Sequence, residues 1–72
     1  MIDFHGIRLV DAEQKWWELH TAAAYGGKRY HELCVGHGVI RARFLELARQ
    51  NGVECREKLG NAGVLVAMFG GI

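Results

Sequence analysis

The residues with the clearest chemical potential fall in two short segments. Asp3 and His5 stand two positions apart near the N-terminus, and His37 stands between Gly36 and Gly38. A histidine changes charge near neutral pH, so either imidazole could donate to a phosphate or move a proton. An aspartate beside a histidine could orient it, share a metal ion with it or cap a neighbouring turn. These residue types suit acid–base chemistry at a phosphate.

The two glycines predict a turn that leads into a helix. Free N–H groups and the positive dipole at a helix N-terminus can hold an anion, and glycine lets a phosphate come close. The same pattern is ordinary turn chemistry, because a tight turn can need glycine for its conformation alone. Both interpretations stay open for Gly36 and Gly38, as does a solvated loop position for His37 and a backbone-bonded one for His5.

Further candidates surround these two segments. Arg41 and Arg43 follow the glycines within about two turns of predicted helix and could reach phosphates, although a solvated charged face accounts for them nearly as well. A divalent metal ion held by Asp3, His5 and His37 is a further alternative, but no motif fixes its geometry.

Size and composition limit what the chain can be. Its 72 residues make one domain, because so short a chain buries only about 60% of its unfolded surface. Half of the residues are hydrophobic and 24% are charged, which is typical of a globular domain. Without a long apolar run or a leader-like N-terminus, we expect a cytoplasmic protein with no membrane partner. Cys34 and Cys55 lack a C-x-x-C spacing and are expected to be free thiols.

The net charge of +1 is unevenly distributed along the chain. Five basic and two acidic residues between Lys28 and Arg49 give that stretch +3, and the other four basic and six acidic residues give −2. This asymmetry favours an anionic partner for the middle of the chain.

Hydrophobic periodicity predicts the elements that must position the candidate residues. The predicted order is βαβαββ, with strands over residues 2–5, 30–35, 53–57 and 64–69, helices between residues 7 and 26 and over residues 39–50, and a turn over residues 59–63. The residue pair Asn51-Gly52 predicts a left-handed stop for the second helix. The continuous apolar run of the last strand is typical of a strand in the middle of a sheet.

This order of elements predicts where the candidate residues meet. A strand–helix–strand unit closes as a right-handed crossover with parallel strands, so the turns after His5 and Val35 should emerge at the same edge of the sheet. Ligands of open α/β sheets bind at the carboxyl ends of parallel strands. We therefore expect Asp3 and His5 near residues 36–38. The expected fold class is α/β, a two-layer sandwich in which two helices cover one face of a four-stranded mixed sheet.

Three blocks of the sequence resemble one known family. Residues 2–6 (IDFHG) resemble the L-D-L-H-G signature of the Smr domain, the small MutS-related module. Residues 28–38 (KRYHELCVGHG) are similar to that family's second strand and its T/H-G-x-G loop, and residues 60–63 (GNAG) resemble its closing glycine turn. The resemblance covers essentially all of residues 1–72, in order and at compatible spacing, as a single Smr-like domain.

The resemblance implies a fold similar to the C-terminal domain of translation initiation factor three. It also implies association with DNA or RNA, including nicking of DNA and endonucleolytic cleavage of RNA. By position, Asp3, Phe4 and His5 stand in the family's first functional motif, and Gly36 and Gly38 are the glycines of its second.

Two positions depart from the family pattern. Val35 occupies the Thr or His position that opens the second motif, so a polar group found in many relatives is missing. Arg8 replaces the usual Ser or Thr before the first helix, which predicts a weak N-cap.

Three functions fit these observations. The first is an endonuclease, a nuclease that acts by phosphodiester hydrolysis or transesterification, with catalytic residues Asp3, His5 and His37 and nucleic-acid-binding residues Phe4, Gly36, Gly38, Arg41 and Arg43. The second is a nucleic-acid-binding module without catalysis. The third is a protein-interaction module in which a larger protein or a second copy binds the uncovered face of the sheet.

Overall fold

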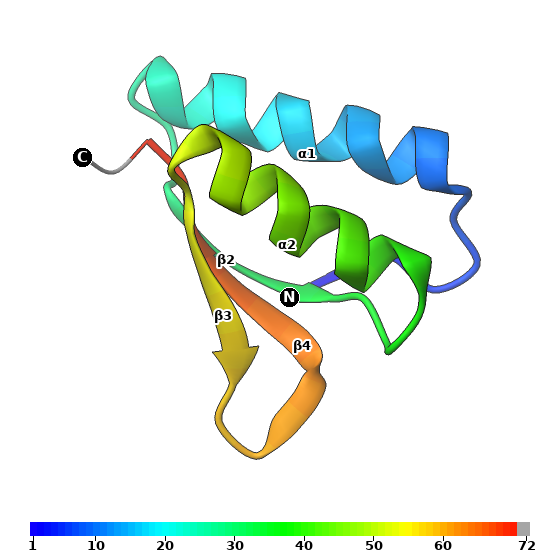
Figure 1. Ribbon diagram of the computed structural model, residues 1–72. Coiled ribbons are helices and arrows are strands. Elements are labelled where there is room, and N and C mark those ends of the chain that lie inside the picture. The colour runs from blue at the N-terminus through cyan, green and yellow to red at the C-terminus, as the bar shows by residue number, and fades with distance from the viewer. Residues whose placement is uncertain (71–72) are drawn as a thin grey trace.

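Six elements alternate along the chain in the order βαβαββ (Figure 1). The structure, a computed structural model, describes residues 1–70. The elements are β1 (Ile2–Asp3), α1 (Leu9–Ala24), β2 (Tyr30–Cys34), α2 (Val39–Asn51), β3 (Glu54–Lys58) and β4 (Asn61–Met68). Both helices lie on one face of a four-stranded mixed sheet. The α/β two-layer sandwich expected from the sequence is confirmed.

The strand order of the sheet is β1-β2-β4-β3. β1 and β2 are parallel, with Asp3 opposite Cys34, whereas β4 runs antiparallel to both β2 and β3. β4 therefore lies between two strands, in the middle of the sheet. This confirms the central position predicted from its apolar run.

Local signals set the helix ends. Arg8 is the N-cap of α1 and makes no side-chain cap bond within residues 1–70; its guanidinium instead pairs with Asp11, with 3.1 Å between Nε and Oδ2. The predicted weak cap is confirmed. α2 ends at Asn51 and is capped by Gly52, whose φ of 67° is the left-handed conformation predicted for the stop.

An aromatic cluster fills the space between the helices and the sheet. Trp16 is fully buried, with its ring centroid 5.0 Å from that of Phe44 and 4.7 Å from that of Phe69. Phe4 meets Phe44 edge-on at 5.0 Å. Such edge-to-face pairs add to the stabilisation from burial. This core joins the start of the chain to both helices and to the last strand.

The second half of the sheet differs from the sequence prediction in its boundaries. The turn covers only Leu59 and Gly60, and β4 already begins at Asn61, which pairs with Lys58 across a β-bulge. The predicted turn over residues 59–63 is therefore too long, because pairing with the neighbouring strand extends β4 toward the turn. Val53 precedes β3 and is buried, with its N–H bonded to the Ala48 carbonyl.

The two cysteines lie on separate strands and are free thiols. Cys55 packs against the core, and this burial raises the pKa of its thiol to about 11.

On the face without helices, Lys58 Nζ lies 3.0 Å from Glu32 Oε1, and this bond is the main reason that the pKa of Glu32 is lowered. Among residues 1–70, no helix is long and apolar enough to cross a membrane.

Candidate functional site

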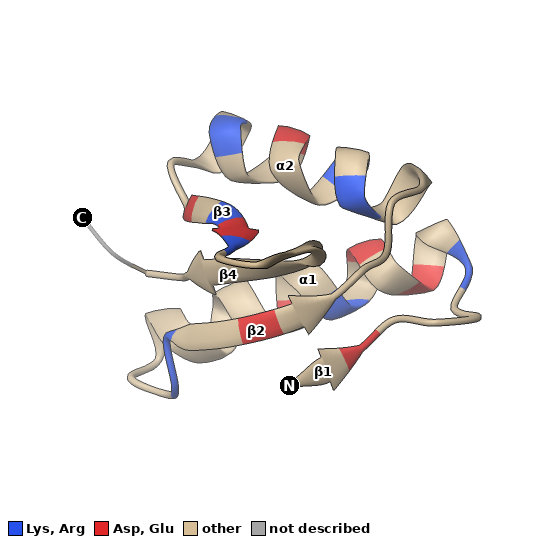
Figure 2. Cartoon of the chain, turned by 90° about the horizontal axis from the view of Figure 1, so that it is seen from below, with Lys and Arg blue, Asp and Glu red and all other residues tan. Residues whose placement is uncertain are grey.

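The two loops that carry the candidate residues leave the sheet side by side. β1 and β2 are parallel neighbours, and beyond β1 the Phe4 N–H still donates to the Cys34 carbonyl at 2.9 Å. Both segments then leave the sheet at the same edge, the first through residues 5–8 into α1 and the second through residues 35–38 into α2 (Figure 2). The parallel pairing therefore brings together two segments that are far apart in the sequence.

Asp3 organises the first loop through the backbone. Its Oδ1 accepts the His5 N–H at 2.9 Å, and both side chains are exposed. The first strand ends at Asp3 rather than at His5, because Phe4 turns into the core and Gly6 adopts a φ of 76°. Of the roles left open for Asp3, capping the neighbouring turn is the one seen.

The two glycines of the second loop have different structural roles. Gly36 has a φ of 67°, a conformation that residues with a side chain rarely adopt. Gly38 has a φ of −98°, outside the left-handed region, and a Cβ placed there would meet no atom within 4 Å. Turn geometry therefore accounts for Gly36, whereas neither conformation nor crowding requires a glycine at position 38.

β4 holds the second loop in place through Gly63. The Gly63 carbonyl accepts the N–H groups of Val35 and Gly36, both at 2.9 Å. A Cβ at position 63 would lie 3.5 Å from His37 Nε2 and 3.4 Å from Asn61 Oδ1, which accepts the Gly63 N–H. Gly63 and Asn61 thus position the loop. Sequence reasoning did not assign them this role, and the sole signal was the glycine turn at residues 60–63.

The N-terminus of α2 opens onto this loop without a side-chain cap. Gly38 is the N-cap, no side chain of the described chain bonds to the free N–H groups, and the first turn contains no acidic residue. These N–H groups and the positive end of the helix dipole are therefore available to an anion.

Arg41 and Arg43 are both engaged by acidic side chains. Arg41 pairs with Glu57, and its Nε donates to the Ala62 carbonyl at 3.1 Å. Arg43 lies between the helices, with Nε 2.5 Å from Glu13 Oε2 and a second bond to Glu46. These hydrogen bonds, that to Glu13 first, raise the pKa of Arg43. Neither arginine is positioned as an unpaired cation.

The candidate Phe4 and the neighbouring loop residue Val35 both face the core. Phe4 is only 2% exposed and packs against Phe44, so its ring has almost no surface to offer a nucleic acid. Val35 is half-buried and also packs against the core.

The basic stretch over residues 28–49 does not form one patch beside the site. Lys28 and Arg29 precede β2, whereas residues 36–38 follow it.

The structure does not support a metal site at Asp3, His5 and His37. Within residues 1–70, no three or more His, Cys, Asp or Glu side chains lie close enough together to hold a metal ion. Asp3, His5 and His37 thus share an edge of the sheet but do not form a metal-binding group.

Comparisons of the chain with models of protein families, with curated proteins and with solved structures find no match. Function must therefore be inferred from the geometry of the site and from the resemblance of its motifs.

Proposed function

We propose that this domain binds DNA or RNA at the edge where β1 and β2 end, and that it cleaves the bound strand there as an endonuclease. The observation that carries the proposal is that two exposed loops, one with Asp3 and His5 and the other with residues 36–38, leave the sheet at the same edge, and that the second leads into the uncapped N-terminus of α2. The likeness of both loops to the two Smr motifs supports the same function.

Each part of the site has a role in this proposal. The N–H groups at the start of α2 hold a backbone phosphate and stabilise the charge that develops on it, and Gly38 leaves room for its approach. His5 or His37 removes the proton of the attacking hydroxyl or water and returns one to the leaving oxygen. Asp3 positions His5 by binding its backbone N–H.

Binding without cleavage is the second candidate function. Val35 supplies no polar group at the start of the second loop, and Arg41 and Arg43 are already paired with carboxylates. Such a site can hold a phosphate at the N-terminus of α2 while lacking the additional polar group and the unpaired cations that would assist cleavage.

The uncovered face of the sheet is the alternative site for a larger protein or a second copy. Val66 and Met68 are half-buried on β4, and Tyr30 is 43% exposed on the neighbouring β2. Self-association through this face predicts a mass that rises with concentration in light scattering, and a monomer throughout would reject it.

The test for cleavage uses supercoiled plasmid and structured single-stranded RNA, each with Mg²⁺ and with EDTA. We expect His5→Ala or His37→Ala to abolish cleavage while the fold is kept, and His20→Ala, a half-buried histidine of α1, to retain it. Equal trace activity in all four proteins would reject the endonuclease. Salt-dependent binding of intact substrate would then favour the binding module.

A further inference from the structure

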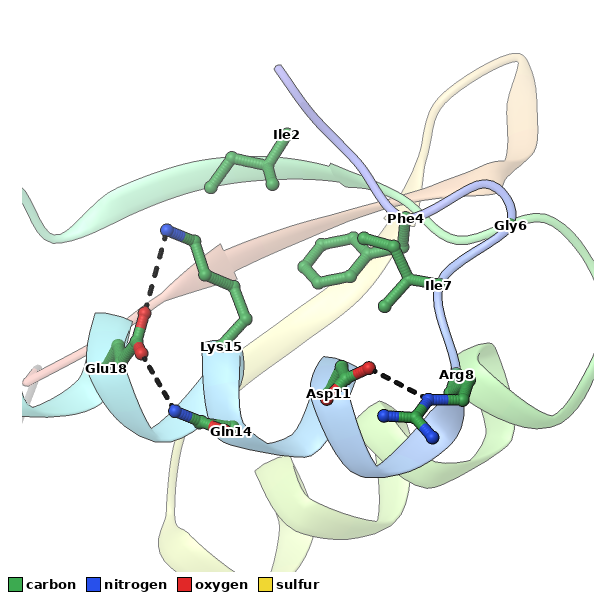
Figure 3. A pocket seen from close by; sticks show the side chains of 9 residues that line it. All are labelled: Ile2, Phe4, Gly6, Ile7, Arg8, Asp11, Gln14, Lys15 and Glu18. Carbon is green, nitrogen blue, oxygen red and sulfur yellow. Dashed lines mark hydrogen bonds and ion pairs between the residues drawn. The ribbon is translucent and has the colours of Figure 1, made fainter.

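A groove lies beside the first loop, between β1 and the first half of α1 (Figure 3). Its volume is about 550 Å³, which is within the range of small-ligand sites. Ile2 and Ile7 form the accessible part of its apolar side, with the buried Phe4 behind them, and α1 contributes polar side chains that include Gln14 and Lys15. The groove therefore offers an apolar surface with a polar rim.

The charges along the rim cancel in pairs. Arg8 Nε lies 3.1 Å from Asp11 Oδ2, and Lys15 Nζ lies 3.8 Å from Glu18 Oε1. Gln14 Nε2 also approaches Glu18 Oε2, at 3.5 Å. With two cations and two carboxylates, the groove does not select a charged group, and a neutral ligand with a flat apolar face suits it better.

The groove begins at the loop that carries His5. Gly6 lines it and belongs to the same loop as His5, whose neighbouring loop leads to the N-terminus of α2. A strand held at these loops by its backbone can thus reach the groove with an adjoining nucleotide.

We infer that the groove receives one unpaired base of a single-stranded nucleic acid. The inference rests on the proposed function and deepens it by naming the substrate class. A base is neutral, its faces are apolar, and its edge carries donors and acceptors, which the Gln14 amide can match. A base stacked inside a duplex cannot enter such a groove without being extruded. The domain therefore selects a single strand or an unpaired nucleotide.

An extended peptide is a poorer occupant. A peptide that adds to a sheet edge depends on main-chain bonds along that edge. β1 offers only two residues, and the next backbone N–H, that of Phe4, is already bonded to Cys34. The groove lacks the length of strand that such an addition requires.

The experiment compares fluorescently labelled oligonucleotides of one length: an oligothymidine, its abasic sugar–phosphate analogue and a blunt duplex. We expect the oligothymidine to bind roughly fivefold more tightly than the abasic strand, because covering one apolar face of a base with Ile2 and Ile7 is worth about 1 kcal/mol. Ile7→Ser and Gln14→Ala should bring this ratio close to one while leaving the affinity for the abasic strand unchanged.

Matched controls lie outside the groove. Val10→Ser removes an apolar side chain that is 60% exposed at the start of α1, and Gln50→Ala removes an amide at the end of α2; both should keep the wild-type ratio. In amide NMR spectra, residues 6–8 and 14–18 should shift with oligothymidine and not with the abasic strand.

The possible outcomes separate this inference from the proposed function. Equal binding of oligothymidine and abasic strand overturns the base site and leaves backbone binding in place. A base preference that survives Ile7→Ser and Gln14→Ala, with shifts elsewhere, also overturns it. Binding of none of the three nucleic acids overturns both proposals. Shifts around Ile7 that depend on protein concentration alone would assign the groove to a second copy.

Discussion

The imidazole of His37 lies against Gly63, so that a loop residue after β2 rests on a strand that enters the sheet much later in the chain. A Cβ at position 63 would be 3.5 Å from His37 Nε2 and 3.6 Å from the Gly36 Cα. The Gly63 carbonyl also accepts hydrogen bonds from the backbone N–H groups of Val35 and Gly36. The orientation of His37, a candidate catalytic residue, therefore depends on the absence of a side chain at position 63 of β4.

Substitutions at Gly63 test this dependence. Gly63→Ala should be tolerated, because its Cβ makes contacts of 3.4 Å or more. Gly63→Val should cost about 1–3 kcal/mol from overpacking and displace His37, although valine is the better strand former. Urea denaturation and the imidazole NMR signals of His37 measure the two effects. Wild-type stability and unchanged His37 signals in Gly63→Val would contradict this account.

The two loop glycines should respond differently to alanine. Gly36→Ala forces a side chain into a φ of 67° and should cost about 1–2 kcal/mol of stability. Gly38→Ala has open space and should stay within about 0.5 kcal/mol of wild type, yet weaken oligonucleotide binding because its methyl group stands where a phosphate would approach. Denaturation and fluorescence anisotropy test the pair. Unchanged binding by Gly38→Ala would show that the phosphate does not bind at the N-terminus of α2.

The salt dependence of binding should be shallow. Arg41 and Arg43 are each paired with carboxylates, so few unpaired cations are left to release counterions from the nucleic acid. We expect a plot of log K against log salt concentration with a slope of roughly −1 to −2, and little effect of Arg43→Gln. A slope of about −3 would mean that both arginines exchange their carboxylates for phosphates on binding.

The stability of the fold should fall as the pH drops below about 6.5. Burial of His31 lowers its pKa from 6.5, more than the hydrogen bond to the Lys28 carbonyl raises it. The unfolded chain therefore takes up a proton first, and stability is lost from pH 6.5 down to the lower pKa of the folded state. Urea midpoints at about pH 7.5 and about pH 5.5 measure this loss. His31→Gln should reduce it, whereas His20→Gln should retain it.

The thiol of Cys55 should react slowly in the folded protein. Burial raises its pKa to about 11, and the thiolate is the reactive form. In the variant Cys34→Ser, labelling of Cys55 by iodoacetamide near neutral pH should be at least roughly tenfold slower in buffer than in urea. Equal rates would mean that β3 opens readily from the core.

Local patterns in the sequence were enough to predict the architecture. The apolar positions Trp16 and Phe44 recur at helical spacing with their neighbours, and Gly52 supplies a left-handed stop, so both helices could be located from their own residues. The parallel crossover then required the loops after β1 and β2 to share one edge. These features depend on backbone conformation and chain handedness, which short segments determine.

The partners of individual side chains were decided only by the tertiary structure. Phe4 stands in a family motif yet is buried, Arg43 is paired with Glu13 of the other helix, and Gly63 positions His37. Each contact joins elements that approach only after the core has packed. Residue type and spacing could therefore indicate which residues belong to the site. Packing between distant segments decided which of these residues are exposed, which are paired with a carboxylate and which are positioned by another strand.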